Sequence, residues 1–213
     1  MSGITQSTAM WYASRATGIV SLVLFTLVVL LGILVNRQGR LPGLPKFAVT
    51  GLHRSVSLLA VVFLVIHVVT AIFDGYVSIQ LAAAIIPFTS GYLPLPIGLG
   101  AIALDLIAAL VITSLLRARI GRRLWRGVHW LAYAAFPVAV LHSITSAKDL
   151  RSGALLALTA GCVLSVAAAG CYRATAARAG RWPKAAEGAA RPTTAGAGPH
   201  WTENRMLKEG ASR

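Results

Sequence analysis

The sequence has little charge for its length, and acidic residues are especially scarce. Only 12% of its 213 residues are charged, with 6 Asp and Glu against 20 Lys and Arg, whereas 56% are hydrophobic. This composition excludes an ordinary soluble enzyme and predicts a membrane protein. The net charge of +14 does not indicate nucleic-acid binding, because the basic residues lie in short loops between apolar segments and in the C-terminal tail.

Cysteine is rare as well. Cys162 and Cys171 are the only two cysteines, and they lack the CxxC and CxxCH spacings of redox, zinc and covalent heme sites. They are therefore interpreted as small apolar residues, and any heme is expected to be held noncovalently.

Long apolar stretches are abundant. Five are long enough to cross a bilayer as helices, at residues 18–35, 56–73, 97–116, 128–145 and 153–172. A sixth stretch, 77–88, is short and contains Pro87, which predicts a re-entrant or interfacial segment. The expected fold is all-α: a polytopic membrane helical bundle of about five transmembrane helices in residues 1–172. A disordered, basic, low-complexity cytoplasmic tail is expected in residues 173–213.

Basic residues predict the orientation of the bundle. With five crossings, one side receives the basic residues of the first loop, of the loop before the fourth span, and of the tail. The other side receives only Arg15, Lys148 and Arg151. Because cytoplasmic loops are enriched in Lys and Arg, we expect a multi-pass cell-membrane protein with its N-terminus outside and its C-terminus in the cytoplasm.

Histidine is the most informative residue, since four of the five histidines lie in or beside apolar stretches. His53 and His67 are 14 positions apart, which places them about 21 Å apart along a helix and within about 40° around it. His129 and His142 are 13 positions apart, about 20 Å along the axis, but an ideal helix would turn them about 140° apart. Pro137 lies between them and predicts a distortion of that helix.

The two histidine-bearing helices are expected to run parallel, so that His53 meets His129 near the inner face and His67 meets His142 near the outer face. Ionisable side chains within spans are rare and usually face a partner or a cofactor. Two imidazoles fill both axial positions of a heme iron, which suits electron transfer. We predict two b-type hemes per chain with these four metal ligands. A histidine-lined metal-ion transporter or metal-binding membrane protein without redox activity is the alternative.

Three arginines are candidates to bind the anionic heme propionates. Arg54 and Arg126 lie near the predicted inner heme, and Arg15 lies near the outer one. Membrane topology alone would also place an arginine at each of these positions. Asp105 falls within the third span, where a bare carboxylate is costly, and is expected to serve in proton transfer or in a polar contact between helices.

Three segments resemble a known family: LHRSVSLLAVVFLVIHVVTAIFDGY and LWRGVHWLAYAAFPVAVLH, joined by GLGAIALDLIAALVITSLLRARIG. They are similar to the ferric reductase-like transmembrane domain of ferric reductases, NADPH oxidases and the heme-binding subunit of the periplasmic methionine sulfoxide reductase system. The resemblance covers roughly residues 11–172. It implies two b-type hemes that carry electrons outward, with His53 and His129 on the inner heme and His67 and His142 on the outer heme.

The chain departs from part of that family after the last span. Ferric reductases and NADPH oxidases carry a flavin and NADPH module there, whereas this sequence has a low-complexity tail. The expected function is therefore that of a reductase component with a separate electron donor, either a flavoprotein reductase or a quinol. Flavin is expected only in such a partner protein. Ferric iron, oxygen, a flavin-bearing extracytoplasmic protein and a molybdenum enzyme stay open as acceptors. A quinol-oxidising cytochrome b subunit of a larger complex also stays open.

Overall fold

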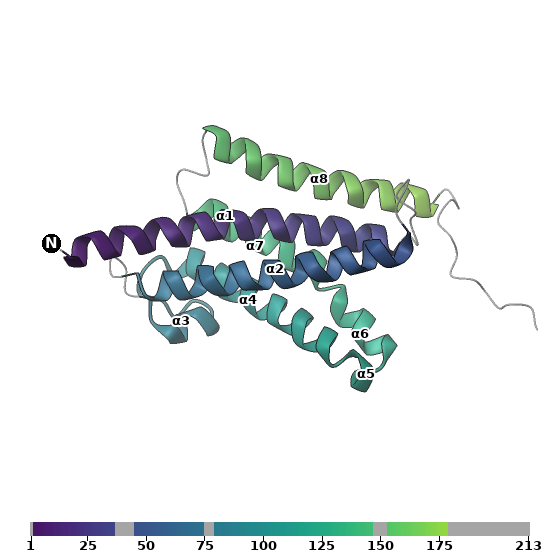
Figure 1. Ribbon diagram of the computed structural model, residues 1–213, viewed down its shortest axis with the longest axis horizontal. Helices are drawn as coiled ribbons and strands as arrows, with labels where there is room; N and C mark the ends of the chain where they lie inside the picture. Colours follow the sequence, from purple (N-terminus) through teal and green to yellow (C-terminus); the bar gives the residue numbers. More distant parts are fainter. Residues whose placement is uncertain (1, 37–44, 75–78, 147–152, 179–213) are drawn as a thin grey trace, which may run out of the picture.

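The computed structural model describes residues 2–36, 45–74, 79–146 and 153–178, and these residues are largely helical. The helices follow one another along the chain (Figure 1) as α1 Ser2–Asn36, α2 Lys46–Ile72, α3 Leu81–Ile85, α4 Pro94–Leu115, α5 Arg117–Ile120, α6 Arg122–His129, α7 Ala132–Ser146 and α8 Gly153–Arg178.

Five helical stretches are long and apolar enough to cross a membrane, which confirms the predicted polytopic helical bundle. They are Ala9–Val35, Phe47–Ile72, Pro94–Leu115, Arg122–Ser146 and Gly153–Thr175. Large apolar side chains such as Leu58, Leu115 and Leu164 are exposed on the outside of the bundle, as expected for helices surrounded by lipid. Within the described part of the predicted short segment, α3 has only five residues and is too short to cross.

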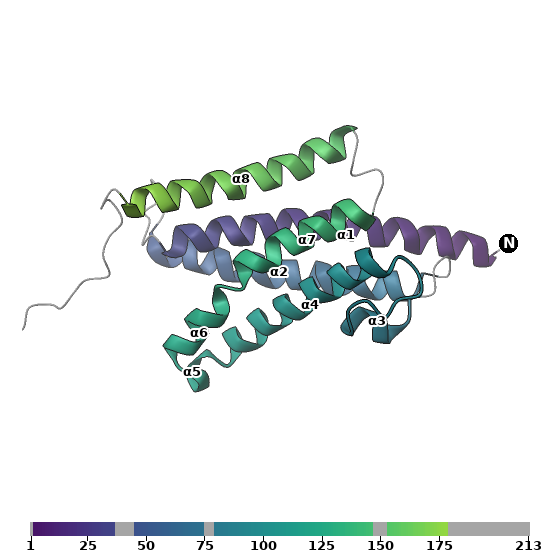
Figure 2. The ribbon, with the colours of Figure 1, turned by 180° about the vertical axis from the view of Figure 1, so that it is seen from behind.

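The spanning helices pack mainly as two pairs. α1 packs against α2, α4 packs against α7, and α8 lies along α1 on the side away from α4 (Figures 1 and 2). A small core joins the pairs through Leu22, Val29 and Ile33 of α1 and Phe136 and Val140 of α7. The backbones of α2 and α7 barely approach each other in the described part of the chain. Side chains therefore bridge the space between these two helices.

The helix that carries His129 and His142 is interrupted, but not at Pro137. α6 ends at His129, Trp130 and Leu131 form a turn, and α7 continues through the proline. Around this turn, backbone N–H groups donate three residues back, from Trp130 to Gly127, from Leu131 to Val128 and from Tyr133 to Trp130. Such bonds wind the chain more tightly than an α-helix, so each residue adds more rotation about the helix axis. The added rotation turns His142 toward the helix face that carries His129. The predicted position was therefore wrong. The ring of Pro137 clashes with the carbonyl four residues back, at Tyr133, so it disturbs the chain directly after this turn.

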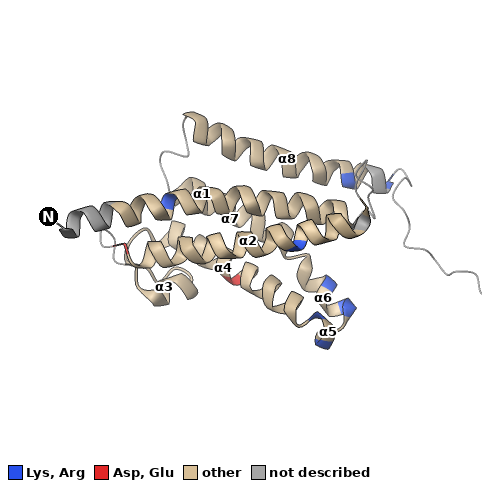
Figure 3. Ribbon diagram, in the orientation of Figure 1, with Lys and Arg blue, Asp and Glu red and all other residues tan. Residues whose placement is uncertain are grey.

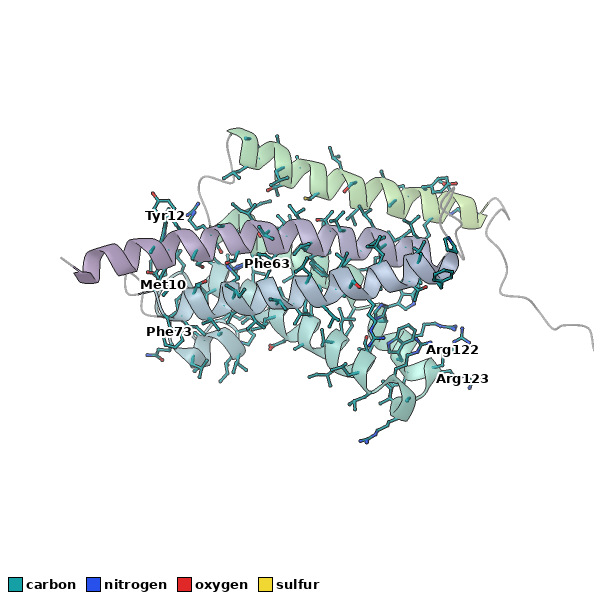
Figure 4. The ribbon with its side chains drawn as sticks, viewed as in Figure 1. Met10, Tyr12, Phe63, Phe73, Arg122 and Arg123 are labelled. Carbon is teal, nitrogen blue, oxygen red and sulfur yellow. The ribbon has the colours of Figure 1, made fainter. Side chains whose placement is uncertain are left out.

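Positive charge gathers at one end of the bundle. Lys and Arg residues lie on α5, α6 and the last turns of α8 (Figure 3), and the side chains of Arg122 and Arg123 extend from α6 away from the bundle (Figure 4). This end is the one that the sequence predicts to be cytoplasmic, and the orientation in the membrane stays a prediction. Several charges used for that prediction lie outside the described residues, namely Arg37, Arg40, Lys148 and Arg151.

The last helix is longer than predicted. α8 continues beyond Tyr172 to Arg178, so residues 173–178 of the predicted tail are helical. The rest of that segment, including His200, lies outside the described residues. The division between bundle and tail at residue 172 stays a prediction.

Candidate functional site

The four histidines meet in two pairs between α2 and the helix formed by α6 and α7. The ring centroids of His53 and His129 are 6.5 Å apart with an interplanar angle of 73°. Those of His67 and His142 are 6.3 Å apart with an angle of 71°. These are the partners expected from the sequence, because the two helices run in the same direction. The two sites are therefore separated along the helices by the rise between the histidines.

The distance between the rings of each pair is informative. A metal–imidazole bond is about 2.0 to 2.1 Å long, and a five-membered ring with sides of about 1.35 Å has its centre about 1.15 Å from each atom. Two imidazoles bound on opposite sides of one metal ion therefore have their centres about 6.4 Å apart. The observed separations of 6.5 and 6.3 Å match this value. Each pair is thus spaced for one metal ion between its rings.

Hydrogen bonds determine which nitrogen of the His67–His142 pair is free to bind a metal. Nδ1 of His67 lies 2.8 Å from the carbonyl oxygen of Ser14, and Nδ1 of His142 lies 2.8 Å from that of Pro96. Because a carbonyl group only accepts hydrogen bonds, each Nδ1 carries the proton and donates. Nε2 of each ring then retains the lone pair that binds a metal, and the bond through Nδ1 orients the ring.

Three of the four rings lie directly against the backbone of a neighbouring helix at a glycine. A Cβ built on Gly18 would lie 3.0 Å from Cε1 of His67, and one built on Gly32 would lie 3.5 Å from Cε1 of His53. On α4, a Cβ on Gly100 would lie 2.7 Å from Cε1 of His142. The sequence analysis missed these glycines. The available signal was the spacing of 14 between Gly18 and Gly32, which equals the spacing of the histidines that they face.

The fourth ring, that of His129, is held by an aromatic side chain. The indole of Trp125 stacks on it with a centroid distance of 4.8 Å and an angle of 26°. Nδ1 of His129, and Nδ1 of His53 beside the carbonyl of Val28, are buried without a hydrogen bond of acceptable geometry. The two histidine pairs therefore differ in what surrounds them. Trp125 was also missed, although its position four residues before His129 places both on one helix face.

The three predicted arginines differ in their exposure. Arg54 and Arg126 are exposed, and the half-buried Arg15 places its guanidinium 4.5 Å from the ring centroid of Trp11. Their role toward propionates stays a prediction. The side chain of Asp105 is exposed on α4, so the structure does not place it in the predicted contact between helices.

The donor set at each level limits the groups that it could hold. Among the described residues, no three His, Cys, Asp or Glu side chains gather around a possible metal position. A zinc ion normally takes four ligands, whereas a porphyrin supplies four equatorial nitrogens and leaves only the two axial positions to the protein. A pair of imidazoles spaced for one metal ion therefore fits the iron of a b-type heme.

One comparison with known proteins relates the chain to a family. The family described as ferric reductase like transmembrane component matches residues 17–140, more than half of the chain. The matched region contains His53, His67 and His129, and His142 lies two positions beyond it. No curated protein and no solved structure matches the chain.

Proposed function

Because the chain belongs to the family of ferric reductase-like transmembrane components, we propose that it carries electrons across a membrane through two b-type hemes, one at each histidine pair. The observation that carries the proposal is the spacing of the rings. Centroid separations of 6.5 and 6.3 Å match the value of about 6.4 Å for two imidazoles on opposite sides of one metal ion.

Each heme, when bound, supplies an iron that gains and loses one electron. His53 and His129 would hold one iron through their ring nitrogens, and His67 and His142 would hold the other. Because two imidazoles would hold each iron, the heme would supply electron transfer rather than oxygen binding. The carbonyl groups of Ser14 and Pro96 hold the outer two rings in the tautomer that leaves Nε2 free.

We infer the direction of transfer from the charge distribution. The arginine-rich end of α5 and α6 faces the cytoplasm under the positive-inside rule, so electrons enter near His53 and His129 and leave near His67 and His142. The donor is a separate molecule, a flavoprotein reductase or a quinol, and the acceptor lies outside. The exposed arginines of α5 and α6 favour a protein donor with a negatively charged docking surface, because opposite charges steer two proteins toward each other.

A visible spectrum of the purified full-length protein tests the proposal. We expect two noncovalent b hemes per chain with reduced-minus-oxidised bands of low-spin iron. Replacing His67 with Ala should remove one of the two hemes, whereas His200→Ala, at the fifth histidine outside the apolar stretches, should retain both. A colourless protein with stoichiometric zinc would instead support the metal-binding alternative.

A further inference from the structure

The two histidine pairs are held in different ways. At the His67–His142 pair, both rings donate a hydrogen bond to a backbone carbonyl group. At the His53–His129 pair, neither Nδ1 makes a hydrogen bond of acceptable geometry. An imidazole bound to a metal through one nitrogen can rotate about that bond unless another contact holds its plane. The Nδ1 atom therefore does not orient the ring of His129, and its plane depends on contacts with the ring face.

Trp125 makes such a contact. Its indole lies almost parallel to the His129 ring, with an interplanar angle of 26° and a centroid distance of 4.8 Å. The indole is itself held, because its Nε1 donates to Oγ of Ser114 on α4 at 3.4 Å. The hydrogen bond connects α6 to α4, so the plane of the indole depends on the packing of two helices and not on a single rotamer.

The Trp125 ring also lies beside a positive charge. The guanidinium carbon of Arg117 lies 4.4 Å from the centroid of the Trp125 ring, in the range of a cation–π interaction. Arg117, Trp125 and His129 therefore follow one another from the arginine-rich end toward the histidine pair. This contact holds a fixed cation near the pair, whereas Arg119 on the same short helix makes no such ring contact in the described part of the chain.

We propose that Trp125 and Arg117 are positioning residues of the His53–His129 site, Trp125 setting the plane of the axial ring of His129 and Arg117 raising the electron affinity of the iron bound there. The proposal rests on the proposed function. Oxidised iron carries one more positive charge than reduced iron, so a nearby cation favours the reduced form. The Ser14 and Pro96 carbonyl groups act oppositely at the other pair, because they make the ligands more basic and favour oxidised iron.

The first test concerns the ring plane. The EPR signal of low-spin iron with two axial imidazoles depends on the angle between the two ring planes, which is 73° at this site. We expect Trp125→Leu to change the EPR signal of one heme only, and Trp125→Phe, which retains an aromatic face, to restore most of it. Ser114→Ala should produce a smaller change of the same kind. Trp130→Leu is the matched control. The ring of Trp130 also lies beside an arginine, Arg173 at 5.0 Å, but its aromatic neighbour is Tyr133 and not a histidine.

The second test concerns the charge. A redox titration of the full-length protein should resolve two one-electron components, and His67→Ala identifies the component that belongs to the His53–His129 site. We expect Arg117→Gln to weaken reduction of the iron at that site by about threefold to tenfold. At about 59 mV per tenfold for one electron, the reduction potential should fall by about 30 to 60 mV. Arg117→Lys should retain most of the wild-type potential. Arg119→Gln, which removes a neighbouring charge without a ring contact, should shift it less.

The outcomes separate this proposal from the proposed function. A protein that binds no heme would overturn both. Two hemes with wild-type EPR signals and potentials in Trp125→Leu and Arg117→Gln would overturn only the role of Trp125 and Arg117. Equal effects of Trp130→Leu or Arg119→Gln would do the same, since the changes would then report general packing or charge.

Discussion

Gly100 of α4 lies directly against the imidazole of His142, so that a Cβ at this position would be 2.7 Å from Cε1 and 2.8 Å from Nδ1. Real Cβ atoms essentially never come so close, and the ring cannot retreat without losing its hydrogen bond to Pro96. Small residues at such contacts allow helices in a membrane to approach closely. The imidazole of His142 can therefore occupy its position only because residue 100 has no side chain.

We expect Gly100→Ala to lower the heme content from two hemes per chain to about one, because His142 would be displaced from the site that it shares with His67. Heme extraction with quantification per chain measures the effect. Gly161→Ala in α8, where a Cβ would meet nothing within 4 Å, is the matched control and should retain both hemes. Retention of both hemes in Gly100→Ala would mean that this contact does not position the ligand.

The two glycines of α1 should respond differently to the same change. A Cβ on Gly18 would lie 3.0 Å from Cε1 of His67, tighter than ordinary contact, whereas one on Gly32 would lie at an ordinary 3.5 Å from Cε1 of His53. Gly18→Ala should therefore weaken heme binding at the His67 site. Gly32→Ala should retain both hemes and stabilise α1 by up to about 1 kcal/mol, because alanine favours a helix over glycine. Heme content and thermal unfolding of both variants test this, and a reversed order would contradict it.

Pro137 should influence heme binding from a distance. Replacing it with Ala restores a backbone donor and removes the ring that disturbs the preceding turn. We expect the chain around Trp130 and Leu131 to wind more nearly as an ideal helix, which would rotate His142 away from His67. Pro137→Ala should then lose the heme of that pair and retain the other, as seen in the visible spectrum. Unchanged spectra would show that the turn is maintained without the proline.

Double variants test the pairing itself. His53→Ala and His129→Ala should each remove the same heme, so the combination of both should lose no more than either alone. His53→Ala combined with His142→Ala should lose both hemes, because the two changes affect different sites. Non-additivity is expected within a site and additivity between separate sites. Heme stoichiometry of the single and double variants measures this, and the opposite pattern would exclude the assigned pairs.

The limits of the sequence prediction are visible at particular residues. The apolar runs and the 14-residue spacing of His53 and His67 predicted the spans and one shared face, since helical rise and rotation are properties of a single element. The distortion near Pro137 was expected, but the hydrogen bonds that define it lie several residues earlier. A local rule identifies that a helix must bend, whereas the packing of neighbouring helices decides where it bends.

By itself, the sequence determined that this chain forms a helical membrane bundle and that His53 and His67 share one helix face, because hydrophobic length and helical periodicity are encoded locally. Tertiary structure alone decided that the rings of each pair are spaced for a single metal ion and that Gly18, Gly32 and Gly100 lie against three of them. It also decided that the indole of Trp125 holds the fourth ring. The physical reason is that these contacts join helices distant in sequence, so they depend on how the helices approach one another.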